Sequence, residues 1–342
     1  PNLTIGKGRA GRMGLVVDGK WQVDEAYAAD AKGGFVRPQS KFRSWITRDG
    51  APGPSGSGGF AAEAGRYHLY VAGVCPWAHR TRLYHALKGL DGVVGLSLAS
   101  SKRTEYGWEF VPDDPALRDP LFDARYVYEL YVRADPQYTG RATVPVLWDK
   151  KRGTIVSNES SEIIRMFNAA FDGVTGNRAD FYPPHLRAEI DALNERIYAK
   201  LNNGVYRAGN AKTQEAYEDG ARSVFETLDW LEERLSSRRY LCGDALTEAD
   251  WRVFPTLVRF DTAYYYVMKC NLRRLADYPN ISAYTRELYQ MRGIAETVDL
   301  AAIKSGYWSN RERNPTGIVP LGPTVDFAAP HDRARLSAKA AE

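Results

Sequence analysis

The chain has 342 residues, 44% of them hydrophobic, and a net charge of +4 at neutral pH. This length and composition predict two globular domains. Because lysine and arginine form no dense block, a nucleic-acid-binding protein is not indicated, and because no apolar run approaches the about 18 residues of a membrane span, we expect no membrane partner.

The cysteine content indicates a reducing compartment. Three cysteines occur in the whole chain, too few for a disulfide scaffold in a protein of this length. The first residues contain no apolar secretory segment. We therefore expect free thiols and a cytoplasmic protein.

Residues 1–60 predict an extension and not a domain. Glycine and proline are frequent, and residues 51–59 (APGPSGSGG) can form only a loop. The segment is nevertheless too aromatic for a disordered tail. We expect its aromatic side chains to pin it across the body of the protein: Trp21, Phe35, Phe42 and Trp45.

The first predicted domain covers residues 61–170. Its expected elements are a strand at 66–72, a helix at 77–88, a strand at 92–98, a helix through 126–131, a hairpin of 143–148 and 154–156, and a helix at 159–170. The order βαβαββα is typical of a thioredoxin-like domain.

Cys75 falls where the first strand gives way to the first helix, and Pro76 takes the favoured first helical position. A thiol there lies beside unpaired backbone N–H groups and the positive end of the helix dipole, which favour the thiolate. We expect His79 and Arg80 to add positive potential. The alternative interpretation is a buried structural cysteine.

A dithiol oxidoreductase would carry a second cysteine three residues after the first. Ala78 stands at that position. A mixed disulfide on Cys75 then has no neighbouring thiol to resolve it, so a small thiol from solution must do so. Glutathione is the obvious candidate.

Val144 and Pro145 form a second informative element. A proline that opens a strand belongs at a strand edge or a bulge, since it has no N–H for the ladder. In a thioredoxin-like sheet this proline is cis and lies beside the reactive cysteine, and the Val144 backbone can then bind glutathione as a short added strand. A trans proline at a strand start is the alternative.

Residues 158–162 (NESSE) open the last helix of this domain. Backbone N–H groups and hydroxyls there can bind a carboxylate, and Glu159 can pair with an α-ammonium group. A γ-glutamyl group carries both charges on one carbon, which suits this arrangement. The alternative is a plain helix cap that needs no ligand.

The second predicted domain, residues 184–310, is helical, and a C-terminal tail follows at 311–342. We expect helices around 193–198 and over 213–235, with a further helix after the loop at 240–246. Thr247 and Asp250 predict a capping box with aspartate in the glutamate position, so Asp250 is assigned to folding. Cys242 and Cys270 are expected to be packing residues.

At this point the sequence resembles a known family. The segment 243–250 (GDALTEAD) beside a thioredoxin-like half is similar to glutathione transferases. The resemblance to the glutathionyl-hydroquinone reductases, the Xi class of these transferases, extends over residues 13–330. It rests on the segments 75–80 (CPWAHR), 106–108 (YGW), 140–150 (GRATVPVLWDK), 202–206 (NNGVY), 259–261 (RFD), 269–271 (KCN) and 314–318 (NPTGI).

This resemblance implies a fold, a reaction and a site. The fold is an α/β thioredoxin-like N-terminal domain followed by an all-α C-terminal domain. The reaction is reduction of S-glutathionyl-hydroquinones by glutathione, with Cys75 as the nucleophile and Tyr206 as the proton donor or acceptor, while Tyr264 and Tyr307 lower the thiol pKa. The residues that hold glutathione are Trp108, Arg141, Ala142, Thr143, Val144, Glu159 and Ser160.

The resemblance also implies glutathione as co-substrate, no metal, and a homodimer. Two local features differ from the family pattern. The segment 103–105 (RTE) before Trp108 is one, and the run of three tyrosines at 264–266 is the other, so that Tyr265 is the alternative to Tyr264. Two other functions remain open: a thiol transferase or dehydroascorbate reductase of the omega type, and a non-catalytic binding module.

Overall fold

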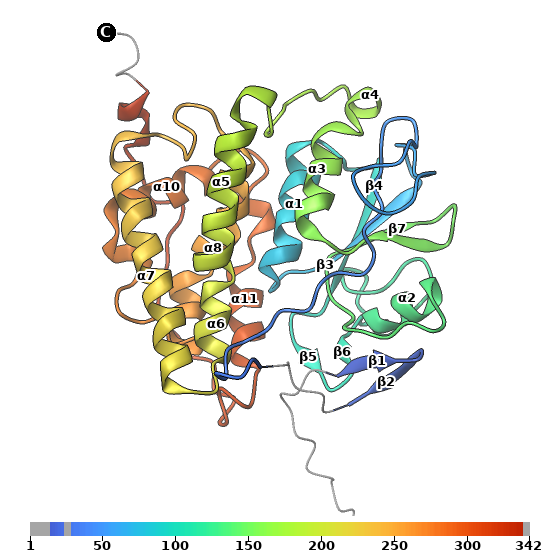
Figure 1. The fold of residues 1–342 in the computed structure, drawn as a ribbon, viewed down its shortest axis with the longest axis horizontal. Coiled ribbons are helices and arrows are strands. Elements are labelled where there is room, and N and C mark those ends of the chain that lie inside the picture. The colour runs from blue at the N-terminus through green and yellow to red at the C-terminus, as the bar shows by residue number, and fades with distance from the viewer. Residues whose placement is uncertain (1–13, 24–28, 338–342) are drawn as a thin grey trace, which may run out of the picture.

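The structure is a computed structural model that describes residues 14–23 and 29–337. Parts of the predicted extension (1–13 and 24–28) and of the predicted tail (338–342) lie outside the described residues. Figure 1 shows a sheet-containing part beside a helical part, with the N-terminal arm crossing from one to the other. None of the described helices has the length and apolar character needed to cross a membrane.

The sheet-containing part confirms the predicted order βαβαββα. Its elements are β3 (Tyr67–Ala72), α1 (Pro76–Leu87), β4 (Val94–Ala99), α2 (Val127–Ala134), β7 (Val146–Asp149), β8 (Thr154–Ser157) and α3 (Ser160–Ala169). The strand order is β4-β3-β7-β8, with β3 parallel to β4 and antiparallel to β7. The fold is therefore the thioredoxin-like one.

Strand β3 forms the centre of this sheet, and each of its six residues is buried. Helices α1 and α3 lie between the sheet and the helical part, and α2 lies on the other side (Figure 1). A strand covered on both faces is normally apolar throughout, and the aromatic and aliphatic residues of β3 fit this pattern. The exception is His68, whose buried Nε2 hydrogen-bonds to Ser97 Oγ at 2.9 Å.

Two features of this part differ from the prediction. The strand expected at 143–148 begins only at Val146, which pairs with Tyr70, because Pro145 has no N–H to donate to the ladder. The connection before α2 contains a small hairpin that was not predicted, β5 (Arg103–Thr104) and β6 (Gly107–Trp108).

The helical part confirms the three predicted helices and adds others. Its elements are α4 (Asp172–Thr175), α5 (Arg187–Ile197), α6 (Gly204–Asn210), α7 (Gln214–Ser237), α8 (Glu248–Leu257), α9 (Tyr265–Val267), α10 (Pro279–Tyr289) and α11 (Leu300–Trp308). Single π-helical turns at Tyr198–Asn202 and Phe260–Tyr264 interrupt the regular helices.

The capping box at the start of α8 is confirmed. The Thr247 N–H donates to Asp250 Oδ2 at 2.8 Å, and the Thr247 side chain caps the helix in return. Asp250 Oδ1 also accepts from the Leu241 N–H and the Tyr284 hydroxyl. The carboxylate therefore has a full set of structural partners, which fits its assignment to folding.

The N-terminal arm is pinned to the body, as its aromatic content predicted. It opens with an unpredicted hairpin, β1 (Leu15–Val17) and β2 (Lys20–Gln22). Trp21 stacks on Tyr128 with ring centroids 4.8 Å apart. Further along, the arm runs beside β8, where the Ser44 N–H donates to the Val156 carbonyl at 2.9 Å. The arm thereby extends the sheet and reaches the functional site.

Candidate functional site

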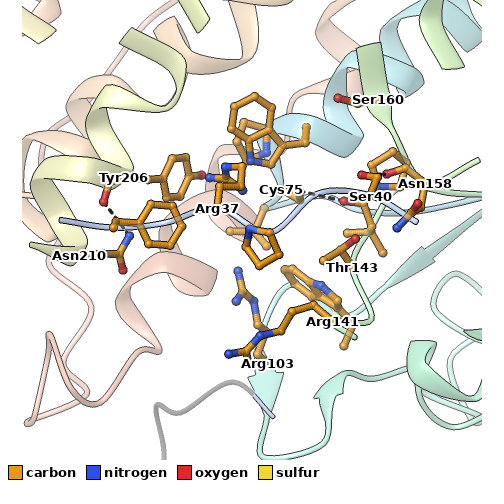
Figure 2. Close-up of a pocket in the computed structure, with 18 of the residues that line it drawn as sticks. Arg37, Ser40, Cys75, Arg103, Arg141, Thr143, Asn158, Ser160, Tyr206 and Asn210 are labelled. Atoms are coloured by element: carbon orange, nitrogen blue, oxygen red, sulfur yellow. Dashed lines mark hydrogen bonds between the residues drawn. The ribbon is translucent and has the colours of Figure 1, made fainter. Parts of the chain in front are cut away.

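A cavity of about 830 Å³ opens around Cys75, and residues from both parts of the protein line it (Figure 2). Of the residues expected at the site, nine line this cavity: Cys75, Trp108, Arg141, Thr143, Val144, Glu159, Ser160, Tyr206 and Tyr307. Ala142 and Tyr264 lie outside the lining. The cavity thus gathers segments that are more than 230 residues apart in the chain.

Cys75 is the residue that directly precedes α1, with Pro76 at the first helical position. Its backbone is extended (φ −79°, ψ 118°), so the chain turns from strand to helix at the thiol. The side chain is 9% exposed, and its Sγ lies 3.6 Å from the Val144 carbonyl oxygen. A small accessible thiol at a helix start is the arrangement expected for a nucleophile.

The expectation that His79 adds positive charge beside Cys75 was wrong. His79 is buried, and burial followed by the charge of Arg259 holds the pKa of its imidazole well below the usual value. Arg259 Nη1 donates to His79 Nδ1 at 2.9 Å, and a guanidinium can only donate, so Nε2 carries the proton and donates to Thr297. The imidazole is therefore neutral.

Arg80 keeps its charge and hydrogen-bonds to the helical part. Burial lowers the pKa of its guanidinium to about 9, which leaves it protonated at neutral pH. The group donates to Asn202 Oδ1 at 2.8 Å and to the Arg252 carbonyl. Its main role in the structure is to join α1 to the helical part.

Arg259 joins the helical part to the loop that carries the thiol. Its side chain is fully buried, and it donates to the Gly73 carbonyl at 2.8 Å and to the Val74 carbonyl at 3.0 Å. The remaining contacts are the Pro255 carbonyl and His79. The Arg259 guanidinium thus binds the carbonyl groups of the two residues that precede Cys75, and all of its acceptors are neutral.

Three phenol groups meet on the helical side of the cavity. Tyr206 and Tyr307 have their hydroxyl oxygens 2.6 Å apart, and Tyr264 lies 3.2 Å from Tyr307 and 3.4 Å from Tyr206. We call these residues the tyrosine cluster. Tyr206 and Tyr307 line the cavity, while Tyr264 is fully buried behind them.

The tyrosine cluster is neutral at physiological pH. Burial raises the pKa of all three phenols, and the charge on Cys75 contributes further for Tyr206 and Tyr307. Each phenol therefore retains a proton to donate. Since Tyr206···Tyr264 is the longest of the three contacts, it is the one most easily exchanged for a hydrogen bond to a ligand in the cavity.

The two π-helical turns set the directions of the Tyr206 and Tyr264 side chains. One turn directly precedes α6, which carries Tyr206, and the other ends at Tyr264. An extra residue in a helix turns the following side chains to another face. Tyr265 is not part of the tyrosine cluster, and Tyr266 is 52% exposed. The structure thus brings Tyr264 into the site position for which Tyr265 was the alternative.

The opposite side of the cavity comes from the thioredoxin-like part, and we call Cys75, Val144, Glu159 and Ser160 its sheet-side wall. Glu159 precedes α3 and accepts from the Ser161 N–H at 3.1 Å. Burial would raise the pKa of its carboxyl, but the hydrogen bonds it accepts and the charge of Arg80 lower the pKa overall. Glu159 therefore offers an ionised carboxylate beside a helix N-terminus.

The backbone before Pro145 is positioned by Tyr131. The Tyr131 hydroxyl donates to the Thr143 carbonyl at 2.8 Å and accepts from the Thr143 N–H at 3.2 Å. The Val144–Pro145 peptide bond is cis, as expected for a thioredoxin-like sheet. The Val144 N–H has no acceptor among the described residues. This peptide edge can therefore pair with an extended ligand next to Cys75.

Trp108 and Arg141 complete this end of the cavity. Trp108 is 6% exposed and lies under the guanidinium of Arg103, whose Cζ is 4.3 Å from the ring centroid. Arg141 Nη1 donates to the Gly14 carbonyl at 2.9 Å, so the hairpin of the arm contacts the site as well. In Figure 2, Arg103 and Arg141 lie on the opposite side of Cys75 from Ser160.

Sequence reasoning missed the residues that the arm and the tail contribute. Ser40 donates to Glu159 Oε2 at 3.1 Å, and Arg37 lies over the rings of Trp77 and Tyr206 at 4.7 and 5.0 Å. Arg313, in the tail, also lines the cavity. The aromatic residues of the arm indicated that it is pinned, but no sequence signal indicated where.

No group of three histidine, cysteine, aspartate or glutamate residues in the described ranges is placed to hold a metal ion. The groups that line the cavity include a thiol, phenols, carboxylates and guanidinium groups.

Comparison with known proteins identifies the two parts separately. Residues 74–170 match the family model "Glutathione S-transferase, N-terminal domain", and residues 214–287 match "Glutathione S-transferase, C-terminal domain". The first match covers the thioredoxin-like part from Val74 onward, and the second covers α7 to α10.

Full-length relatives narrow this further. The chain is 51% identical over 324 residues to the glutathionyl-hydroquinone reductase YqjG of Escherichia coli, covering 94% of this chain and 98% of that protein. It is 50% identical over 313 residues to the glutathionyl-hydroquinone reductase PcpF of Sphingobium chlorophenolicum, covering 91% and 96%.

Solved structures agree with these relatives. The glutathione-bound structure of YqjG superimposes with a TM-score of 0.87 at 49% identity, over 94% of this chain and 99% of that one. A Xi-class transferase from Natrialba magadii gives a TM-score of 0.87 at 42% identity, over 96% and 98%. This chain therefore belongs to the glutathione transferase family, within the Xi class that contains the glutathionyl-hydroquinone reductases.

Proposed function

We propose that the protein reduces S-glutathionyl-hydroquinones to hydroquinones with glutathione as co-substrate, through a mixed disulfide on Cys75. The observation that carries this proposal is that the Cys75 thiol lines a cavity shared with neutral phenols, while the other two cysteines lie outside that cavity. The thiol supplies a nucleophile and the phenols supply a proton, which are the two groups the reaction needs.

Glutathione binding follows from the sheet-side wall. The ionised carboxylate of Glu159 suits the α-ammonium of the γ-glutamyl group, and the N-terminal amides of α3 with Ser160 suit its α-carboxylate. The Val144 peptide suits the backbone of the cysteinyl residue. Trp108, Arg141 and Thr143 line the part of the cavity left for the rest of the tripeptide.

In the first half-reaction the Cys75 thiolate attacks the glutathionyl sulfur of the conjugate. A sulfur–sulfur bond forms as the bond between that sulfur and the ring carbon breaks, and the electron pair remains on the ring carbon. Tyr206 delivers a proton to this carbon, and the hydroquinone leaves. Tyr206 suits this role because it faces the cavity and holds its proton until the carbon becomes strongly basic.

In the second half-reaction a second glutathione attacks the glutathionyl sulfur of the mixed disulfide. Oxidised glutathione leaves, Cys75 returns as thiolate, and the proton lost by the second thiol restores Tyr206. The two electrons that the ring carbon gains are those lost when the thioether sulfur of the conjugate and the thiol sulfur of the second glutathione become joined in a disulfide. This half-reaction needs no acid of its own, because a thiolate is a stable leaving group.

The other two phenols have different positions and different expected roles. Tyr307 shares the shortest contact with Tyr206 and lines the cavity, so it can donate to the thiolate or to a ring oxygen. Tyr264 has no access to the cavity and acts through its hydrogen bonds to the other two. We therefore assign Tyr264 as a positioning residue.

A substrate comparison tests this proposal. Purified protein is assayed with glutathione on an S-glutathionyl-hydroquinone and on dehydroascorbate, the substrate of the omega-type alternative. Much higher kcat/KM on the conjugate supports the proposal. Preference for dehydroascorbate favours the omega type, and no turnover of either favours a binding module.

The family resemblance further implies a homodimer in a compartment where thiols stay reduced. The three cysteines of the chain are free, which fits such a compartment. Sedimentation equilibrium tests the dimer directly.

A further inference from the structure

The cavity is lined by more cationic than anionic side chains. Its lining includes seven arginine and lysine residues and three glutamates. One of the seven, Arg43, is paired with Glu162. Two others come from the arm and the tail: Arg37 and Arg313.

Two of these cations flank Tyr206. Arg37 Nε donates to Asn203 Oδ1 at 2.8 Å, just before α6, and Arg313 donates to Asn210 Oδ1 at the end of that helix. Asn210 in turn donates to the Tyr206 carbonyl at 2.8 Å. Both guanidinium groups are thus fixed by neutral asparagines at the two ends of the helix that carries the proton donor.

Neither arginine has an acidic partner among the described residues. The acceptors of Arg313 are Asn210 and the Gly209 carbonyl, and Arg37 contacts only Asn203 and aromatic rings. Burial lowers the pKa of Arg313, and the charge of Arg103 lowers it further. A partly buried guanidinium group whose acceptors are all neutral favours an anion beside it.

The placement of these arginines separates them from the glutathione subsite. Glu159 and Ser160 lie at the start of α3 in the thioredoxin-like part. Arg37 and Arg313 instead hydrogen-bond to asparagines at the two ends of α6, the helix that carries Tyr206 and beside which the ring of the conjugate has to lie. Figure 2 shows Arg37 close to Tyr206 and away from Ser160. Both arginines also lie outside the two matched transferase models. The arm and the tail therefore each deliver one cation to the ring end.

We propose that Arg37 and Arg313 form an anion subsite for the ring, so that this enzyme prefers hydroquinone conjugates whose ring carries a carboxylate. This inference rests on the proposed function, since it defines the substrate class of that site. Guanidinium groups are suited to this role because they bind a carboxylate through two parallel hydrogen bonds. Arg37 is held flat against Trp77 and Tyr206, which limits the entropy lost on binding.

Two conjugates test the proposal: the S-glutathionyl conjugate of unsubstituted hydroquinone and that of a hydroquinone with a carboxymethyl group on the ring. The measured quantity is the ratio of their kcat/KM values. We expect the wild-type ratio to favour the acid by about 10-fold or more, and Arg37→Gln or Arg313→Gln to lower the ratio by about 10-fold each. Arg37→Lys and Arg313→Lys should retain most of the preference, and the surface variant Arg292→Gln should retain all of it.

The ratio separates the subsite from other roles. A merely structural role of Arg37 in pinning the arm lowers both kcat/KM values equally and leaves the ratio unchanged, which overturns the proposal. If Arg37 or Arg313 instead binds the glycyl carboxylate of glutathione, the glutamine variants also leave the ratio unchanged, which overturns the proposal. In that case the variants raise the KM of the second glutathione as well. If wild type turns over the neutral conjugate but shows no preference for the acid, the subsite fails while the proposed function stands; if it turns over neither, the proposed function itself fails.

Discussion

The two sides of the cavity differ in how the chain builds them. Each residue of the sheet-side wall belongs to a short segment with a strong local pattern, such as the start of α1 at Cys75 or the start of α3 at Glu159. The tyrosine cluster is assembled from positions 206, 264 and 307, which no local pattern connects.

The nucleophile and the general acid therefore have their positions determined in different ways. A thiol can be activated by the helix that follows it, so its position is set within a few residues. A proton donor for the ring has to lie on the other side of the glutathionyl sulfur from Cys75. That side of the cavity is formed by the helical part. Arg259 couples the two sides, since it belongs to the helical part and holds the carbonyls of Gly73 and Val74.

The largest expected effect comes from removing the thiol. Cys75→Ser should lower kcat by at least about 10⁴-fold, because a hydroxyl is far too weakly acidic to replace the thiolate. Thermal unfolding should be nearly unchanged, which separates chemistry from folding. Cys242→Ala is the matched control, because burial raises the pKa of that thiol to about 11 and it lies outside the cavity. Substantial activity in Cys75→Ser would remove the nucleophile from the account.

Removing the proton donor should affect one half-reaction alone. Tyr206→Phe should slow hydroquinone release by about 10²- to 10⁴-fold, the usual contribution of general-acid catalysis, and should leave cleavage of the mixed disulfide by glutathione nearly unchanged. Single-turnover measurements of each half-reaction check this. Tyr265→Phe is the control that keeps the tyrosine cluster intact. Equal slowing of both half-reactions would make Tyr206 a positioning residue instead.

Removing Arg259, which connects the two sides of the cavity, should lower both the free energy of unfolding and the reactivity of Cys75. Arg259→Met leaves the Gly73 and Val74 carbonyls without their buried donor, at about 1–3 kcal/mol for each unsatisfied group. We expect the free energy of unfolding to fall by about 2–4 kcal/mol, as measured by urea denaturation, with a lower alkylation rate of Cys75 in the folded variant. An unchanged alkylation rate would show that Arg259 stabilises the fold without acting on the thiol.

The smallest effect concerns His79, which is neutral in the folded protein. Its pKa is lowered by folding, so the unfolded chain binds a proton below about pH 6.5 that the folded chain does not, and stability falls as the pH falls through that value. Between pH 7 and 5.5 this contribution amounts to about 1.4 kcal/mol.

His79→Gln should remove that part of the pH dependence. Glutamine can accept from Arg259 and donate to Thr297 in the same geometry, but it binds no proton. Urea denaturation at both pH values measures the difference, with the surface variant His185→Gln as control. An unchanged pH dependence would mean that His79 is protonated in the folded protein, as the sequence first suggested.

The sequence could predict what depends on neighbouring residues. The order βαβαββα, the position of Cys75 and the capping box of Thr247 and Asp250 all follow from patterns within about ten residues. The roles of Tyr206, Tyr264 and Tyr307 came from the family resemblance, because in a chain with 21 tyrosines no single one stands out. The structure adds that Tyr264 lies behind the other two.

The charge state of His79 and the positions of Arg37 and Arg313 depend on long-range contacts that cannot be predicted from the sequence. In an isolated helix His79 can bind a proton near pH 6.5, but burial and the charge of Arg259 keep it neutral in the fold. Arg37 and Arg313 appear as ordinary surface arginines of an arm and a tail until the fold brings them to Asn203 and Asn210. Burial and long-range contact decide both cases.

The measurement that tests the central claim most directly is the trapping of the mixed disulfide. The enzyme is mixed with one equivalent of an S-glutathionyl-hydroquinone without free glutathione, quenched in acid, digested and analysed by mass spectrometry. The account predicts that the peptide containing Cys75 gains one glutathionyl group in step with hydroquinone release, that the peptides with Cys242 and Cys270 stay unmodified, and that added glutathione removes the group. Release of hydroquinone with no glutathionyl group on Cys75 would contradict the account.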